Sequence, residues 1–199
     1  CGPGSFAPQV GDDALSSLPR LMQVMADAGA DYLEFPVGAV QADAGEDAFS
    51  PLRHALEKQA LRVEAFNSFI PGHHRITGPD VNMDAVLKYC RTALERCKTL
   101  GGEVVVLGSA KARSVPDGFD FQRAQEQFVA FGRALGPVAE EVGITIAIEP
   151  LNAKEDNLIL SVEHGARLVD EIGHPRIQLL ADLYQIVEEG EPLHHVGDA

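Results

Sequence analysis

Short apolar runs alternate along this chain with longer stretches in which apolar residues recur every three or four positions. The short, β-branched runs predict buried strands, and the longer stretches predict amphipathic helices. Strands are expected at residues 31–35, 61–66, 103–107, 144–148 and 177–181, with a weaker one near residues 1–6. Helices are expected at residues 14–28, 81–100, 121–142 and 162–172.

A polar residue stands at or just after the end of each main predicted strand. These residues are Glu34, Asn67, Ser109, Glu149 and Asp182. The repeated strand–helix order predicts a parallel sheet, in which right-handed crossovers place the carboxyl ends of all strands on one face. In a (β/α)8 barrel these ends converge on one site, whereas an open doubly wound sheet places them along a crevice. Neither glycine-rich nucleotide-binding motif is present, which favours an α/β barrel formed by residues 1–199 as one domain.

The charge balance bears on location and partners. Lys and Arg number 16 against 30 Asp and Glu, so the formal net charge is −14. This acidity argues against a nucleic-acid partner, because phosphate contacts need clustered Lys and Arg. With no apolar run long enough for a membrane helix and no visible secretory signal, we expect a cytoplasmic protein without membrane attachment. Cys90 and Cys97 share a helix face about 10 Å apart, too far for a disulfide, so reduced thiols are expected.

Two strand-end carboxylates carry the sharpest chemical signal. Glu149 follows the run 144–148 and precedes Pro150, and Asp182 follows the run 177–181. We expect the two to lie at the same height on neighbouring strands, about 4.8 Å apart, and carboxylates that close repel each other unless they share a proton or a divalent metal. Oxygen ligands favour Mg²⁺ or Mn²⁺, and an added imidazole would suit Mn²⁺, Co²⁺ or Zn²⁺. The structural alternatives are an ion pair for Glu149 and a helix N-cap for Asp182.

The same residues carry a family resemblance. Glu149-Pro150-Leu151-Asn152, then Glu155 and Asn157, then the run 179–184 resemble the sugar isomerase/epimerase family with the xylose isomerase-like TIM barrel. Segments 64–72 and 107–120 resemble loops of the same family, which includes ketose 3-epimerases and hydroxypyruvate isomerase. The resemblance spans nearly the whole chain and implies a barrel that stops after about six βα units, against about eight in the complete fold.

The resemblance also implies a metal-dependent reaction. In the family, one divalent metal is held by Glu, Asp, His and Glu, and two glutamates move a proton through a cis-enediolate of the metal-bound ketose. Glu149 matches the first Glu, as ligand and proton-transfer group, and Asp182 matches the Asp ligand. Glu155 matches a position near the catalytic Glu. The remaining His and Glu are expected beyond residue 199.

Other residues are expected to contact substrate. Gln185 stands where the family commonly has a substrate-binding His, and its amide can still hydrogen-bond. Glu34 and Asn67 are expected to face the pocket, with an ion pair as the alternative for Glu34. Lys111 and Arg113 could hold a phosphate or carboxylate of the substrate, or could be loop charges. His73 and His74 are interpreted as exposed loop histidines.

The sequence therefore favours a metal-dependent isomerase or epimerase of a sugar or sugar phosphate, with a small carbohydrate as its partner. Family members are often dimers or tetramers, so the resemblance allows a homo-oligomer. One alternative is an inactive partial barrel or a protein that binds sugar without turning it over. An apurinic-site endonuclease on the same barrel is disfavoured by the net charge of −14 and the scarcity of His at strand ends.

Overall fold

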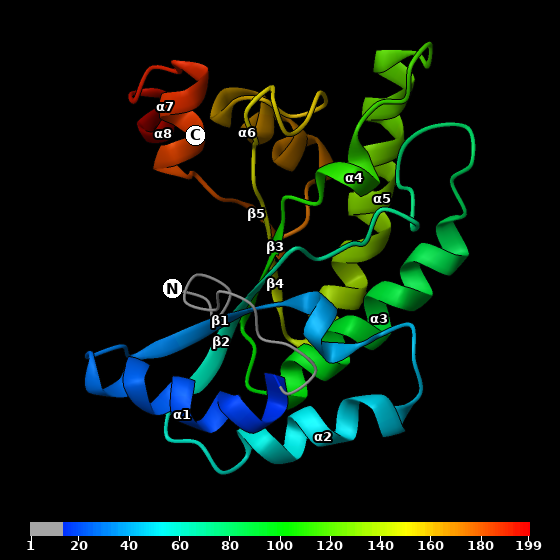
Figure 1. The fold of residues 1–199 in the computed structure, drawn as a ribbon. Coiled ribbons are helices and arrows are strands. Elements are labelled where there is room, and N and C mark those ends of the chain that lie inside the picture. Colours follow the sequence, from blue (N-terminus) through cyan, green and yellow to red (C-terminus); the bar gives the residue numbers. More distant parts are fainter. Residues whose placement is uncertain (1–13) are drawn as a thin grey trace.

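The computed structural model describes residues 14–199, and their strands form one parallel sheet (Figure 1). The sheet order is β1-β2-β3-β4-β5, so each strand pairs with the next one along the chain. This order is that of a barrel wall, whereas a doubly wound sheet reverses its order part-way. The strands are β1 (Tyr32–Pro36), β2 (Arg62–Asn67), β3 (Val104–Leu107), β4 (Thr145–Ile148) and β5 (Ile177–Leu179). They confirm the α/β barrel class and the five main strand predictions; the weaker strand expected near residues 1–6 lies outside the described residues.

Helices connect the strands, and the four predicted helices are present. They are α1 (Ala14–Asp27), α3 (Met83–Thr99), α5 (Phe121–Val142) and α6 (Val162–Ile172). Five further elements were not predicted: η2 (Val37–Val40), α2 (Glu46–Leu56), α4 (Ala110–Arg113), α7 (Leu183–Glu189) and α8 (His195–Asp198). Figure 1 shows α3 and α5 side by side, and α5 also packs against α6. Within residues 14–199, no helix has the length and apolar character needed to cross a membrane.

Capping residues set the helix ends. The side chains of Asn82, Asp120 and Ser161 accept hydrogen bonds from the backbone amides of Ala85, Arg123 and His164, at the starts of α3, α5 and α6. Gly143 ends α5 in the left-handed conformation, with φ of 77°, which costs a glycine little. Pro137 lies inside α5 without ending it, since the helix continues to Val142.

The core lies between the sheet and these helices. Strands β3 and β4 are buried on both faces, as their continuous apolar runs predict. On α3, Cys90 and Cys97 are fully buried free thiols within the predicted apolar stripe, and burial raises the pKa of both.

The strand register brings the carboxyl ends to one edge. Leu107 pairs with Ile148, and Ile148 pairs with Leu179. The pairing continues past the strands, where the amide of Glu149 donates to the carbonyl of Leu107 at 3.3 Å. The loops that follow the strands therefore start at this edge, and they carry the site.

Candidate active site

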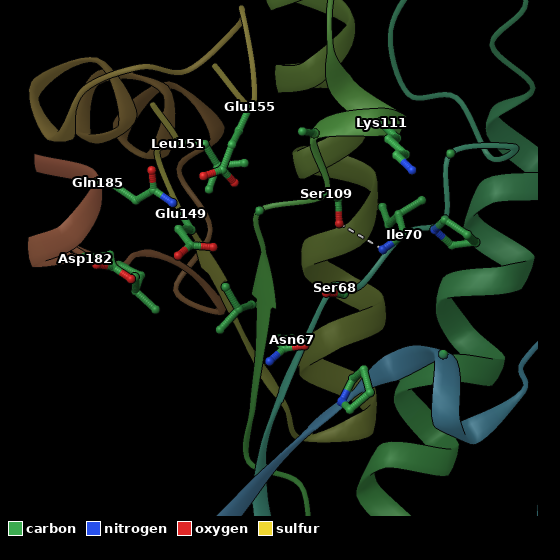
Figure 2. Close-up of a pocket in the computed structure, with 18 of the residues that line it drawn as sticks. Asn67, Ser68, Ile70, Ser109, Lys111, Glu149, Leu151, Glu155, Asp182 and Gln185 are labelled. Carbon is green, nitrogen blue, oxygen red and sulfur yellow. Dashed lines mark hydrogen bonds between the residues drawn. The ribbon is translucent and has the colours of Figure 1, made fainter. Parts of the chain in front are cut away.

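A cavity of about 770 Å³ lies at the carboxyl edge of the sheet (Figure 2). Every strand contributes to its lining, either directly or through the loop that follows it, as the barrel prediction requires. The polar residues at the strand ends all line it: Glu34, Asn67, Ser109, Glu149 and Asp182. Glu155, Gln185 and Lys111 line the same cavity. The arrangement gathers four carboxylates and one lysine around a single space.

Glu149 follows β4 directly and is partly buried. Burial, followed by the charge of Asp182, raises the pKa of its carboxyl to about 7. Arg113 acts in the opposite direction, but its effect is smaller. A carboxyl group that titrates near neutral pH is suited to accept and return a proton.

Asp182 occupies a different height from the one expected. Because Ile148 pairs with Leu179, Glu149 is level with Leu180, and Asp182 lies two residues farther along the chain. There it caps α7: its Oδ1 accepts from the amide of Tyr184 at 2.6 Å. The N-cap alternative is thus realised, yet the side chain also lines the cavity. The two roles are compatible, since a carboxylate offers about four acceptor sites.

A buried amide network supports the β4–β5 side of the cavity. The Oε1 of Gln185 accepts from the backbone amide of Asn152 at 2.8 Å and from its Nδ2 at 2.7 Å. The same Nδ2 donates to Oε1 of Glu155 at 2.7 Å. Asn152 is buried, so these bonds fix the loop that follows Glu149. Gln185 and Glu155 are therefore linked through Asn152 as well as facing the cavity.

The opposite wall comes from the loops after β2 and β3 (Figure 2). Asn67 donates through Nδ2 to the carboxylate of Glu34, so these two predicted residues are paired. Ser109 accepts a hydrogen bond from the amide of Ile70 at 2.9 Å, which joins the two loops. Ser109 has a left-handed backbone, with φ of 31°. Lys111 is exposed at this wall.

Arg113 lies away from the cavity, contrary to expectation. Its side chain is fully buried and forms an ion pair with Asp156, with Nε 2.7 Å from Oδ2. It also donates to the carbonyl oxygens of Leu107 and Glu149, at 2.9 and 2.8 Å. All of these partners lie inside the protein, so Arg113 links the ends of β3 and β4. Its side chain is not exposed to the cavity, where it could contact a substrate.

Two features were missed by the sequence interpretation. Asp156 gives no local signal, because its partner Arg113 lies 43 residues away in the chain. His73 and His74 do not line the cavity, and both hydrogen-bond to Asp43. Both were expected to be exposed, but His74 is partly buried. No motif spacing marks contacts of this kind.

A family model described as a xylose isomerase-like TIM barrel matches residues 22–198. The chain belongs to the xylose isomerase-like TIM barrel family. No curated protein matches the chain in sequence. The expected family resemblance is therefore confirmed.

Solved structures show the same fold. D-psicose 3-epimerase from Clostridium cellulolyticum H10, determined with D-tagatose, superposes with a TM-score of 0.75 at 17% identity, over 88% of this chain and 61% of that one. The 3-keto-D-glucoside 4-epimerase YcjR from E. coli gives 0.73 at 18% identity, over 96% and 72%. An AP endonuclease, family 2, from Brucella melitensis gives 0.69 at 20% identity, over 89% and 67%. The chain thus spans 61% of the length of the psicose epimerase.

The family resemblance implies a divalent metal, and the donor set of Glu149 and Asp182 fits one. Both are carboxylates, the ligands that Mg²⁺ and Mn²⁺ prefer. The charge of Asp182 helps to raise the pKa of Glu149, and a cation between them would relieve that repulsion. Among residues 14–199, no third His, Cys or carboxylate completes a close three-ligand group with this pair.

The raised pKa of Glu149 predicts a pH-dependent stability in metal-free solution. The carboxyl binds its proton more tightly in this barrel than in the unfolded chain, where its pKa is about 4.5. The contribution of the protonated carboxyl to the stability of the folded state is therefore fully present below pH 4.5 and is lost as the pH rises through about 7. The variant Glu149→Gln cannot lose this contribution. Allowing for solvent screening, we expect its free energy of unfolding, relative to that of the parent chain, to rise by about 2 kcal/mol as the pH is raised from 5 to 8. Urea unfolding with a chelator measures this, and a difference independent of pH would contradict it.

Gly108 leaves room for the Glu149 carboxylate. A Cβ at this position would lie 2.6 Å from Oε2 of Glu149, closer than atoms pack. We expect Gly108→Ala to displace the carboxylate and to lower any proton-transfer rate by up to about 10²-fold. Gly45→Ala is the matched control, because nothing lies within 4 Å of its added Cβ. Equal rates in the two variants would show that the space at position 108 does not affect proton transfer by Glu149.

Proposed function

We propose that the chain forms the sugar-binding face of a metal-dependent sugar isomerase or epimerase, in which Glu149 transfers the proton. The observation that carries the proposal is the placing of Glu149, with its pKa raised to about 7, beside a second carboxylate in a polar cavity of about 770 Å³. Cavities of about 300–1,000 Å³ suit small-molecule ligands. Glu34, Asn67, Glu155, Gln185 and Lys111 supply the donors and acceptors that sugar hydroxyl groups require.

Glu149 and Asp182 would hold one divalent cation, with Mn²⁺, Mg²⁺ or Co²⁺ preferred and Zn²⁺ as the alternative. When bound, the cation would supply polarisation of a ketose carbonyl. The Glu149 carboxylate would accept the proton from the carbon beside the carbonyl, while the electron pair of that C–H bond shifts toward the carbonyl oxygen, and would return the proton as the pair shifts back. Asp182 is held in place as the cap of α7, so it presents its carboxylate without rearrangement.

The charges around the cavity favour a sugar over a nucleic acid. The two epimerases share the fold at TM-scores of 0.75 and 0.73. The AP endonuclease shares it too, at 0.69, but four carboxylates and one lysine around the cavity of this chain disfavour a polyanionic backbone. We therefore propose a neutral or singly charged sugar as the substrate.

Solvent exchange tests the proposal on the chain as it stands. Abstraction and return of a proton on one face of a ketose need only one carboxylate, whereas epimerisation also needs a donor on the other face. We expect the chain with Mg²⁺ to exchange the hydrogen next to the carbonyl of D-tagatose or D-psicose for deuterium in D2O, followed by proton NMR. Exchange no faster than in a blank of Mg²⁺ and sugar, with sugar binding intact, would reduce the function to sugar binding.

A further inference from the structure

A second cluster of metal-ligating side chains lies outside the cavity. Nε2 of His73 and Nε2 of His74 lie 3.0 and 2.8 Å from the two different oxygens of Asp43. The ligand atoms of the three residues all lie within 4.8 Å of one another. Within the described part of the chain, this is the one group of three such residues that is so close.

The cluster is held in place from α3. Arg96 of that helix is buried and donates to the carbonyl oxygens of Val40, Gln41 and Ala44, so the loop that carries Asp43 is fastened on both sides of it. The ring of Tyr89, also on α3, lies 4.6 Å from the ring of His74. Its hydroxyl donates to the carbonyl of Phe69 at 3.0 Å. One helix therefore positions both loops that meet at the cluster.

The ligand types match zinc. Two imidazoles and one carboxylate, with a water in the fourth position, are a common zinc set. Ligand atoms at about 2.0–2.1 Å from a tetrahedral zinc lie about 3.3 Å apart. The ligand atoms of the cluster already lie within 4.8 Å of one another, so small side-chain movements would bring them around one ion. The hydrogen bonds from the two histidines outweigh burial and hold the pKa of Asp43 below its usual value, so this ligand is ionised. Mg²⁺ and Ca²⁺ would need more oxygen ligands than the cluster offers.

We propose that Asp43, His73 and His74 bind one Zn²⁺ ion, which links the loop after β1 to the loop after β2. Both loops line the cavity: Gly38 precedes Asp43 in one, and Gly72 directly precedes His73 in the other. Zinc at this position clamps one wall of the cavity. The site is distinct from Glu149 and Asp182, and it does not depend on the function proposed for them.

Isothermal titration of Zn²⁺ into the full chain tests the site. The Glu149→Gln variant serves as the background, because it weakens the cavity carboxylate pair without touching the cluster. In this background we expect one equivalent of Zn²⁺ to bind. Adding His73→Ala or Asp43→Asn should weaken that binding at least about tenfold. The His73 side chain is 64% exposed, so its removal leaves the fold intact, which circular dichroism without metal verifies.

His54→Ala is the matched control. His54 is an exposed histidine on α2 whose Nδ1 lies near Ser50, and we expect its loss to leave Zn²⁺ binding unchanged. If the Zn²⁺ equivalent is absent, or is unaffected by His73→Ala and Asp43→Asn, the cluster is only a set of hydrogen bonds and the proposal is overturned.

Discussion

Replacing Glu149 with Gln is expected to slow deuterium exchange on the ketose by about 10²–10⁴-fold, the usual contribution of a general base. The amide keeps the shape of the side chain but cannot accept the proton, and it is a weaker ligand for a cation. The fold should persist, since the substitution removes a carboxyl whose charge burial disfavours. The rate is measured by proton NMR in D2O with saturating Mg²⁺ and sugar.

Glu103→Gln provides the matched control. Glu103 is exposed and directly precedes β3, so it lies at the edge of the sheet opposite the cavity. Exchange in this variant should equal that of the parent chain. Full exchange in the Glu149 variant would end the assignment of Glu149 as the proton-transfer group, whatever metal or sugar the cavity binds.

Arg113→Met is expected to lower the free energy of unfolding by about 3–5 kcal/mol, because it leaves the carboxylate of Asp156 buried without its cation. The side chains of Arg113 and Asp156 are both 0% exposed, so water cannot replace the lost partner. The carbonyl oxygens of Leu107 and Glu149 also lose a donor. Urea unfolding at neutral pH measures the change.

Two comparison variants separate burial from charge. Arg167→Met breaks an exposed ion pair with Glu163 on α6 and should cost about 0–1 kcal/mol. The double change Arg113→Met with Asp156→Leu should recover part of the loss, because no unpaired charge stays in the core. Equal costs for Arg113→Met and Arg167→Met would show that the buried pair has no special weight.

The strands and main helices could be predicted because each follows from a local pattern. Buried parallel strands are continuous apolar runs, and the crossing helices carry an apolar stripe, as Cys90 and Cys97 do on α3. Helix α2 was missed because Pro51 and a polar first turn obscure its stripe. Glu149 could be placed at the cavity because it directly ends a run of this kind.

Contacts between distant parts of the chain could not be predicted in this way. Asp182 was placed level with Glu149, but the register of β4 and β5 sets it two residues farther on, at the start of α7. Arg113 was interpreted as a substrate contact or a loop charge, and only the packing of the loop around Asp156 shows that it is buried. Asp43 lies 30 residues from His73, and no spacing rule joins them.

The cavity has two chemically different sides (Figure 2). Three of the four carboxylates lie beside β4 and β5, at Glu149, Glu155 and Asp182. On the facing side are the amide, hydroxyl and ammonium groups of Asn67, Ser109 and Lys111, with Glu34 hydrogen-bonded to Asn67. If the proposed function holds, preference among sugar stereoisomers can be altered by substitutions on the facing side while Glu149 and Asp182 stay unchanged. A library of variants at positions 67, 68, 109 and 111 is the place to begin retuning which sugar is accepted.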